Sequence, residues 1–230
     1  MPFDDRDFVM TTIRIQHYSD ILCVWAYVSQ ARLTELEAAF PDEVVIDHHW
    51  FEVFGDVSAK LYANWRDKGG PAAYGAHVRQ IVERFGHVQV HPEIWQRQVP
   101  TSSMPAHLLL CAVRLLGVAE GRCRAAQVAA AVRTAFFRDL VDVSYWPTLL
   151  GIAAQCEVPL RRVEALVESG AAHAALAADL ELARDNQVRA SPTLLFNEGR
   201  QRLTGNVGYR VIEANVRELL QSPAGGQSWC

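Results

Sequence analysis

The order of strand-like and helix-like segments constrains the fold of this chain more than any other feature. Thr11–Tyr18 and Glu43–Val53 are rich in β-branched residues, which favour strands. Between them, Trp25–Phe40 carries a helical apolar stripe that ends before Pro41. The stretch from Gly55 to Gly170 then contains several apolar segments that predict helices, and it has little strand signal. The chain up to Gly170 therefore predicts β-α-β followed by a long helical block.

The C-terminal segment returns to mixed structure. Ala171–Asn186 predicts a helix, Pro192–Asn197 a strand, and Gln201–Thr204 the returning strand of a hairpin. The segment Gly208–Leu220 has helical periodicity and predicts a final helix. The second part of the chain therefore reads α-β-β-α.

If the helical block is an insertion, the remaining order is β-α-β-α-β-β-α, which is the order of a thioredoxin fold. The first two strands should be parallel, because a helical crossover joins them. We expect an α/β protein with a thioredoxin fold, a central four-stranded mixed sheet and a large all-helical insertion that acts as a lid. The expected divisions are 11–54 and 171–221 for the two thioredoxin-fold halves, 55–170 for the insertion, and 1–10 and 222–230 for disordered tails.

Composition and charge exclude several classes of partner. Half of the 230 residues are hydrophobic, which allows a substantial core, and the net charge of −4 disfavours nucleic-acid binding. The sequence has no polybasic block and no apolar run long enough for a transmembrane helix, so we expect no membrane contact. The N-terminus does not resemble a secretory signal, and Met10 is an alternative start.

Five widely spaced cysteines do not form a disulfide pattern, and we expect a cytoplasmic protein. Three of them lie in apolar helical surroundings and are expected to fill space, and Cys230 lies on the C-terminal tail, where it is either incidental or a distant resolving thiol. The three expected filler residues are Cys111, Cys123 and Cys156.

Cys23 is the candidate catalytic residue. It follows the first predicted strand and precedes the first predicted helix. Backbone N–H groups at a helix N-terminus favour the thiolate, so we expect a reactive thiol. The alternative is a buried cysteine that acts as a small hydrophobic residue. Trp25 could line a substrate groove or belong to the core.

Ser191 and Pro192 form the second part of the candidate site. In a thioredoxin-like sheet, this X-Pro step lies beside the helix that carries the cysteine. We predict a cis Ser191–Pro192 bond facing Cys23, with the backbone of Ser191 open to an extended thiol substrate. The alternative is a trans proline that begins an edge strand.

Four segments of the chain resemble the DsbA family of the thioredoxin superfamily, in particular its FrnE-like branch. The resemblance implies a nucleophilic cysteine and a cis-proline strand facing it. The segments are "SDILCVWAYVSQARL" at the cysteine, "HHWFEVF" in the second strand, "VPTSSMPAHLLLCAVRL" at a lid helix, and "VRASPTLLFNEGRQRLTGNVGYRVIEANVREL" near the C-terminus.

Two positions depart from the family pattern D-x-x-C-P-W-C-Y. Val24 stands where proline is usual, and Ala26 replaces the second cysteine. The resemblance therefore supports Cys23 as nucleophile but not a dithiol cycle. Related kappa-class glutathione transferases and 2-hydroxychromene-2-carboxylate isomerases carry serine at the position of Cys23, where it activates the glutathione thiol.

Three functions follow from this pattern. The first is a thiol oxidoreductase that works through Cys23 alone and uses glutathione as a co-substrate. The second is a glutathione-dependent isomerase or transferase in which Cys23 activates the glutathione sulfur, and the third is a redox-inactive protein that binds thiol peptides. All three imply a thiol-containing small molecule or peptide as partner and no tightly bound cofactor. The apolar insertion could also form a homodimer interface.

Histidines give weaker signals. His107 and Cys111 are four residues apart on one predicted helix, but without further ligands nearby we expect no metal site. His48 and His49 are neighbours in a strand and should point to opposite faces of the sheet. Residues 205–208, "GNVG", predict a simple turn before the last helix.

Overall fold

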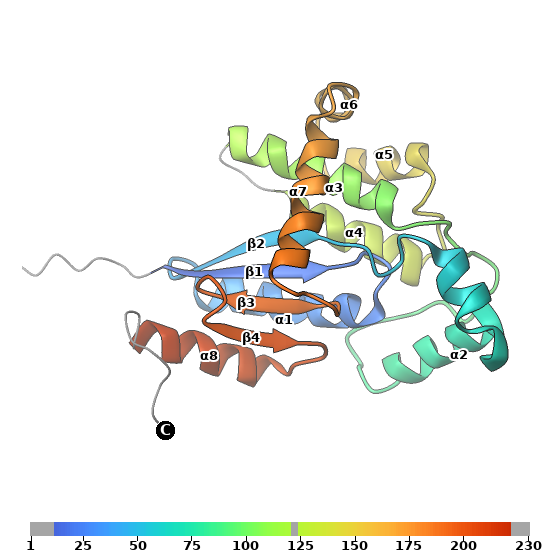
Figure 1. Ribbon diagram of the computed structural model, residues 1–230, viewed down its shortest axis with the longest axis horizontal. Coiled ribbons are helices and arrows are strands. Elements are labelled where there is room, and N and C mark those ends of the chain that lie inside the picture. The colour runs from blue at the N-terminus through green and yellow to red at the C-terminus, as the bar shows by residue number, and fades with distance from the viewer. Residues whose placement is uncertain (1–11, 121–123, 222–230) are drawn as a thin grey trace, which may run out of the picture.

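The computed structural model describes residues 12–120 and 124–221 (Figure 1). The expectations for the two tails, for a start at Met10 and for Cys123 and Cys230 fall outside these residues. Within them, no helix is long and apolar enough to cross a lipid bilayer.

The sheet has four strands in the order β2-β1-β3-β4, which confirms the predicted mixed sheet. β1 (Ile13–Ser19) pairs in parallel with β2 (Val44–Trp50), with Ile13 opposite Val44. β3 (Thr193–Phe196) is antiparallel to both β1 and β4 (Gln201–Thr204). The β1–β3 pairing joins the two ends of the chain, and it places Tyr18 opposite Thr193, close to Pro192.

The helices that complete the thioredoxin fold are α1 (Val24–Ala39), α7 (Ala171–Asp185) and α8 (Tyr209–Gln221). Each lies within two residues of its predicted range. Figure 1 shows α8 beneath β4, and both views show α7 returning from α6 toward β3.

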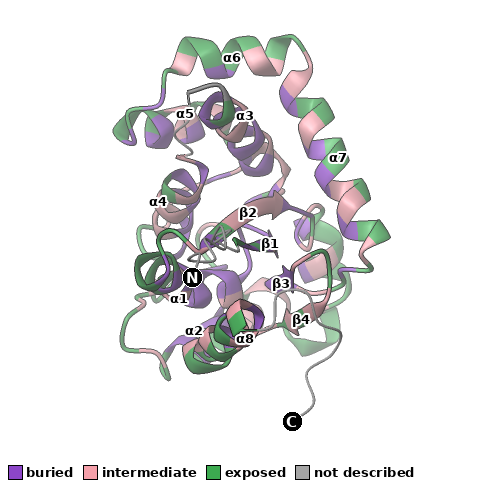
Figure 2. Cartoon of the chain, turned by 90° about the vertical axis from the view of Figure 1, so that its left-hand side faces the viewer, coloured by how far each residue is buried: buried purple, intermediate pink, exposed green. Residues whose placement is uncertain are grey.

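Between β2 and α7, the described residues form helices and a single isolated β-bridge. Figure 2 shows α3, α5 and α6 together beyond β2. The short π-helix and 3₁₀-helix of this region were not predicted, since they have too few residues for a periodic signal. The elements are η1 (Ser58–Ala63), η2 (Arg66–Lys68), α2 (Gly70–Val82), α3 (Met104–Glu120), α4 (Ala125–Phe137), α5 (Trp146–Gln155) and α6 (Leu160–Glu168).

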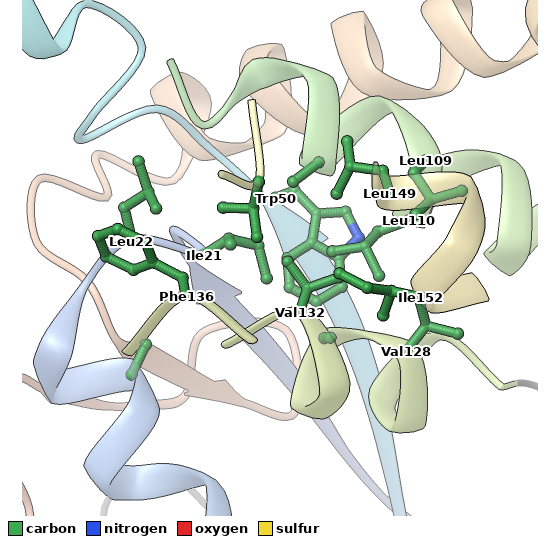
Figure 3. Packing of buried hydrophobic residues seen from close by; sticks show 14 of the residues in the cluster. Ile21, Leu22, Trp50, Leu109, Leu110, Val128, Val132, Phe136, Leu149 and Ile152 are labelled. Atoms are coloured by element: carbon green, nitrogen blue, oxygen red, sulfur yellow. The ribbon is translucent and has the colours of Figure 1, made fainter. Parts of the chain in front are cut away.

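Two hydrophobic clusters hold α1 at its two ends. The N-terminal half of α1 and the loop before it pack with Trp50 and with α3, α4 and α5, where Ile21, Leu22 and Phe136 are fully buried (Figure 3). The C-terminal half, including Leu36, packs with β1, β3 and α8. Each fully buried large apolar side chain contributes about 1.5–3 kcal/mol. The first turn of α1, where Cys23 lies, is therefore enclosed by the helical segment that follows β2.

Candidate active site

Cys23 is the N-cap residue of α1, with extended backbone angles of φ −81° and ψ 117°. Its residue is only 7% exposed, and its thiol donates a hydrogen bond of 3.1 Å to the carbonyl oxygen of Ser191. Burial raises the pKa of this thiol, and the side-chain hydroxyl of Ser191 and the backbone N–H groups of Ala26 and Trp25 lower it by less. The expected bias toward thiolate is therefore wrong for this resting structure, because loss of water outweighs the helix N-terminus.

Ser191 and Pro192 lie directly opposite Cys23, as predicted, and the bond between them is cis. The Ser191 hydroxyl also accepts a hydrogen bond of 2.9 Å from the backbone N–H of Asp20. One residue thus contacts both the thiol and the loop that leads to it, so the cysteine turn and the cis-proline turn form one unit.

The residues after Cys23 differ in exposure. Val24 and Ala26 are buried, at 3% and 0% exposed. Trp25 is half-buried and packs edge-to-face on Phe85, with ring centroids 6.2 Å apart. The methyl group of Ala26 offers no second sulfur one turn into the helix, so this site has a single thiol.

Asp20 organises the loop before Cys23, and our sequence reasoning missed it. Its carboxylate is fully buried, and its charge raises the pKa of Cys23. The only signal in the sequence was its place as the first residue of the D-x-x-C pattern. The carboxylate accepts hydrogen bonds from the backbone N–H groups of Leu22 (2.7 Å), Val53 (2.7 Å) and Phe54 (2.8 Å) and from the hydroxyl of Ser103 (2.9 Å).

His107 belongs to the same buried loop. Its Nε2 accepts a hydrogen bond of 3.1 Å from the backbone N–H of Ile21 and lies 3.8 Å from Asp20 Oδ1. Burial lowers the pKa of His107. Cys111 has a different partner, since its thiol donates to Asp179 Oδ2 at 3.7 Å and burial raises its pKa to about 12. Across residues 12–120 and 124–221, no group of three or more acidic, histidine or cysteine side chains could hold a metal ion.

Tyr74, on α2, is a second residue that the sequence did not indicate. Burial raises the pKa of its phenol, and the neighbouring charges of Cys23 and Asp20 raise it further. Tyr74 packs edge-to-face against Trp65 and Trp95 and at a tilt against Phe54. It is separated from Cys23 by fifty residues in sequence, and only the fold brings the two together.

His48 and His49 point to opposite faces of the sheet, as predicted. His48 Nδ1 lies 3.0 Å from His17 Nδ1, while His49 Nδ1 lies 2.8 Å from Asp179 Oδ1. Since their partners are His17 and Asp179, this pair forms part of the framework around the site.

Similar folds occur in several solved structures, each under 25% identical to this chain. A "probable DsbA oxidoreductase" from Streptomyces coelicolor is 20% identical, with a TM-score of 0.70 over 95% of this chain and 94% of that chain. The cytosolic disulfide reductase DsbM from Pseudomonas aeruginosa is 18% identical, with a TM-score of 0.65 over 89% and 99%, and it has also been solved with GSH. A 2-hydroxychromene-2-carboxylate isomerase is 15% identical, with a TM-score of 0.62 over 92% and 98%.

A search of curated proteins by sequence gives no match. The family model of the DSBA-like thioredoxin domain matches residues 14–217, which include both halves of the sheet, the helices between them and the Cys23 turn. The chain therefore belongs to the DSBA-like thioredoxin domain family.

Proposed function

We propose that this protein is a thiol oxidoreductase of DsbA type that works through Cys23 alone and uses glutathione as its co-substrate. The observation that carries this proposal is the 3.1 Å contact between Cys23 Sγ and the carbonyl oxygen of Ser191, with alanine at position 26. This arrangement presents one thiol beside a backbone segment that an extended thiol substrate could pair with.

The chemistry needs one protein sulfur and two glutathione molecules. The Cys23 thiolate attacks the disulfide of a substrate bound to glutathione, forms a mixed disulfide with glutathione and releases the substrate thiolate. A second glutathione thiolate then attacks this mixed disulfide, releases oxidised glutathione and restores the Cys23 thiolate. A reducing cytoplasm would supply the glutathione. The structure of DsbM with GSH supports glutathione as a ligand of this fold.

The raised pKa of Cys23 favours a second candidate, a glutathione-dependent isomerase or transferase. A thiol that stays protonated at neutral pH can donate a hydrogen bond to a glutathione thiolate. The 2-hydroxychromene-2-carboxylate isomerase among the similar structures supports this candidate. In that reaction Cys23 would not change its oxidation state.

The substitution Cys23→Ser separates the two candidates. A hydroxyl cannot form a mixed disulfide, but it can donate the same hydrogen bond. Under the first proposal, oxidised glutathione leaves one adduct on Cys23 of the parent, and the variant loses all turnover of a glutathione mixed disulfide. Mass spectrometry of the tryptic peptide that contains Cys23 measures the adduct. Cys156→Ser serves as the control, which should keep both the adduct on Cys23 and the turnover of the mixed disulfide.

The opposite result would reject the first proposal. If the parent forms no adduct and Cys23→Ser still turns over an aromatic glutathione-dependent substrate, the isomerase or transferase is the correct assignment. If neither form has either activity but both bind a thiol peptide, the protein is a redox-inactive binding protein.

A further inference from the structure

A cavity lies between α1 and α4, on the side of α1 away from its first turn. It encloses about 240 Å³ and is lined by one face of each helix and by His17 and His48 from the sheet. On α1 the lining residues are Gln30 and the residues three, four and seven positions after it, which places them along one face of the helix. The first of them, Gln30, follows Cys23 by seven residues, or about 10 Å along the helix axis. Neither Cys23 nor Ser191 lines this cavity, although its Arg133 feels the charge of the thiol site.

Arg133 places a cation against the buried side of the cavity. It is 3% exposed and donates to Ser19 Oγ at 2.9 Å and to Gln30 Oε1 at 3.2 Å, both of which are neutral oxygens. Its Nε has no hydrogen-bond partner. Among the described residues, no carboxylate oxygen lies within 4.0 Å of the Arg133 guanidinium, the distance that defines an ion pair. Burial lowers the pKa of Arg133 to about 10, so the group remains charged at pH 7. The acidic groups of Cys23 and Asp20 act on Arg133 from beyond ion-pair distance and raise its pKa by less than burial lowers it. A buried guanidinium without a carboxylate in direct contact is still costly, and an anionic ligand would reduce that cost.

The two histidines of the cavity carry no charge at pH 7, so they neither neutralise Arg133 nor attract an anion in its place. Burial lowers the pKa of His17 well below its usual value and that of His48 to about 3, so both rings are neutral at pH 7. Their Nδ1 atoms are 3.0 Å apart, which requires one ring to donate and the other to accept. One ring therefore carries an Nε2–H and the other a bare Nε2, and the buried Nε2 of His17 has no partner in the protein.

Glu37 supplies the opposite charge at the exposed side of the same cavity. Its side chain lines the cavity one stripe position beyond Thr34, and burial raises the pKa of its carboxyl. No lysine, arginine or histidine of the described residues forms an ion pair with it. Gln30, which is hydrogen-bonded to Arg133, and Glu37 are seven residues apart, or about 10 Å along the axis of α1. The cavity therefore has a cation at its buried side and an anion at its rim, with apolar Leu33 and Ala130 in the walls.

We propose that this cavity binds a small zwitterion, with its carboxylate on Arg133 and its ammonium group toward Glu37. The separation of the two charges favours a ligand whose carboxylate and ammonium are several bonds apart, such as an ω-amino acid or a dipeptide, over a simple α-amino acid. The cavity volume admits a molecule of that size and excludes large ligands.

The test is isothermal titration of the full chain with a ladder of probes: glycine, β-alanine, 4-aminobutyrate and 6-aminohexanoate, each paired with the carboxylate that lacks the amino group. We expect affinity to rise with length from glycine to the longer members, and 6-aminohexanoate to bind at least tenfold more tightly than hexanoate. Glu37→Gln should reduce the affinity for 6-aminohexanoate to that for hexanoate, because only the contact to the ammonium group is lost.

Two further variants test the buried side. Arg133→Gln should abolish binding of every carboxylate, and Ala130→Leu should do the same by filling the cavity without altering any charge. Circular dichroism shows whether each variant is folded, and Ala130→Leu and Glu37→Gln keep the test valid if Arg133→Gln does not fold. The proposal is overturned if the parent binds none of the probes at concentrations up to about 10 mM. It is also overturned if the parent binds hexanoate and 6-aminohexanoate with equal affinity, or if folded Ala130→Leu binds the probes as tightly as the parent does.

Discussion

At Cys23, two physical effects act in opposite directions on the same thiol. The backbone N–H groups of Trp25 and Ala26 favour the thiolate, and burial together with the charge of Asp20 favours the thiol. Burial dominates, so the resting site stores its sulfur as a protonated donor to Ser191. A substrate that brings its own polar groups to the turn, or moves the covering side chains, would shift this balance toward thiolate.

The first prediction concerns the pH dependence of this thiol. Alkylation of Cys23 by iodoacetamide should be slower at pH 7 than that of a free cysteine and should keep rising beyond pH 8.5, the usual thiol pKa, because burial raises the pKa of Cys23. Mass spectrometry of the Cys23 peptide gives the rate, and Cys23→Ser corrects for the other cysteines. A rate that levels off below pH 7 would contradict the raised pKa.

The second prediction concerns the missing resolving thiol. Residue 26 lies in the first turn of α1, three positions after the N-cap cysteine, so Ala26→Cys should form a disulfide with Cys23 under oxidising conditions. The variant should gain dithiol activity, measured as insulin reduction, that the parent lacks. Gln30→Cys, one turn farther along α1, is the control that should form no such bond. Free thiols at both positions 23 and 26 after oxidation would show that the turn cannot close.

At this scale the sequence predicted part of the site and missed the rest for a physical reason. The position of Cys23 before α1 and its contact with Ser191 follow from local patterns, and both are present. Asp20, Tyr74 and the raised pKa of Cys23 depend on loops and helices that come from distant parts of the chain. Burial of one side chain is set by what packs on it, and a local pattern does not contain that information.

At the scale of elements, α7 is attached to the β2 edge by one carboxylate. Asp179 on α7 accepts from the backbone N–H of Trp50 at 3.0 Å and pairs with His49 at 2.8 Å and Arg114 at 2.9 Å. Burial alone would raise the pKa of Asp179, but these partners hold it below its usual value. The contact connects α3, α7 and the end of β2, and so it fixes the helical segment to the sheet.

The third prediction tests this attachment. Asp179→Ala should lower the free energy of unfolding by about 3 kcal/mol, because it breaks a buried ion pair and leaves the Trp50 N–H without its acceptor. Urea unfolding measures the loss. Glu213→Ala removes the pair between this half-buried carboxylate and the exposed Arg217 on α8, and it should cost no more than about 0.5 kcal/mol. Equal losses in the two variants would show that the buried pair has no special role.

Element prediction succeeded where a segment has its own period and failed where it does not. The returning strand Gln201–Thr204 was predicted to the residue, and α1, α7 and α8 to within two residues. The single-turn elements η1 and η2 lie in a segment whose shape is set by packing around Trp65 and Tyr74. Such turns contain too few residues for periodicity to appear.

At the scale of the whole molecule, two buried histidines, one half-buried histidine and two buried thiols limit the pH range in which the fold is stable. Burial lowers the pKa values of His17, His48 and His107, and burial raises those of Cys23 and Cys111. A lowered folded pKa gives stability that is complete above the unfolded value of about 6.5 and is lost as the pH falls. A raised folded pKa gives stability that is complete below the unfolded value of about 8.5 and is lost as the pH rises.

The fourth prediction follows from these signs. The free energy of unfolding should be greatest between about pH 6.5 and pH 8.5, and below that range each buried histidine removes up to about 1.4 kcal/mol per pH unit. Urea unfolding at pH 5, 7.5 and 10 measures the profile. His107→Gln can still accept from the Ile21 N–H and should flatten the acid limb. Unchanged stability between pH 7.5 and pH 5 would contradict the buried, neutral state of these rings.

The pairing of β1 with β3 also determines the order in which parts of the fold can form during synthesis. Cys23 and Ser191 are 168 residues apart in sequence, and β3, β4 and α8 all follow Ser191 or adjoin it. The entropy of closing so long a loop rises only slowly with its length, so the separation costs little stability, but it delays this closure in time. On the ribosome, the helices between β2 and α7 emerge before β3 and can pack around α1 first. The nascent chain therefore carries Cys23 without its opposing turn until Ser191 has been synthesised, 168 residues later, so the contact between the two residues forms late.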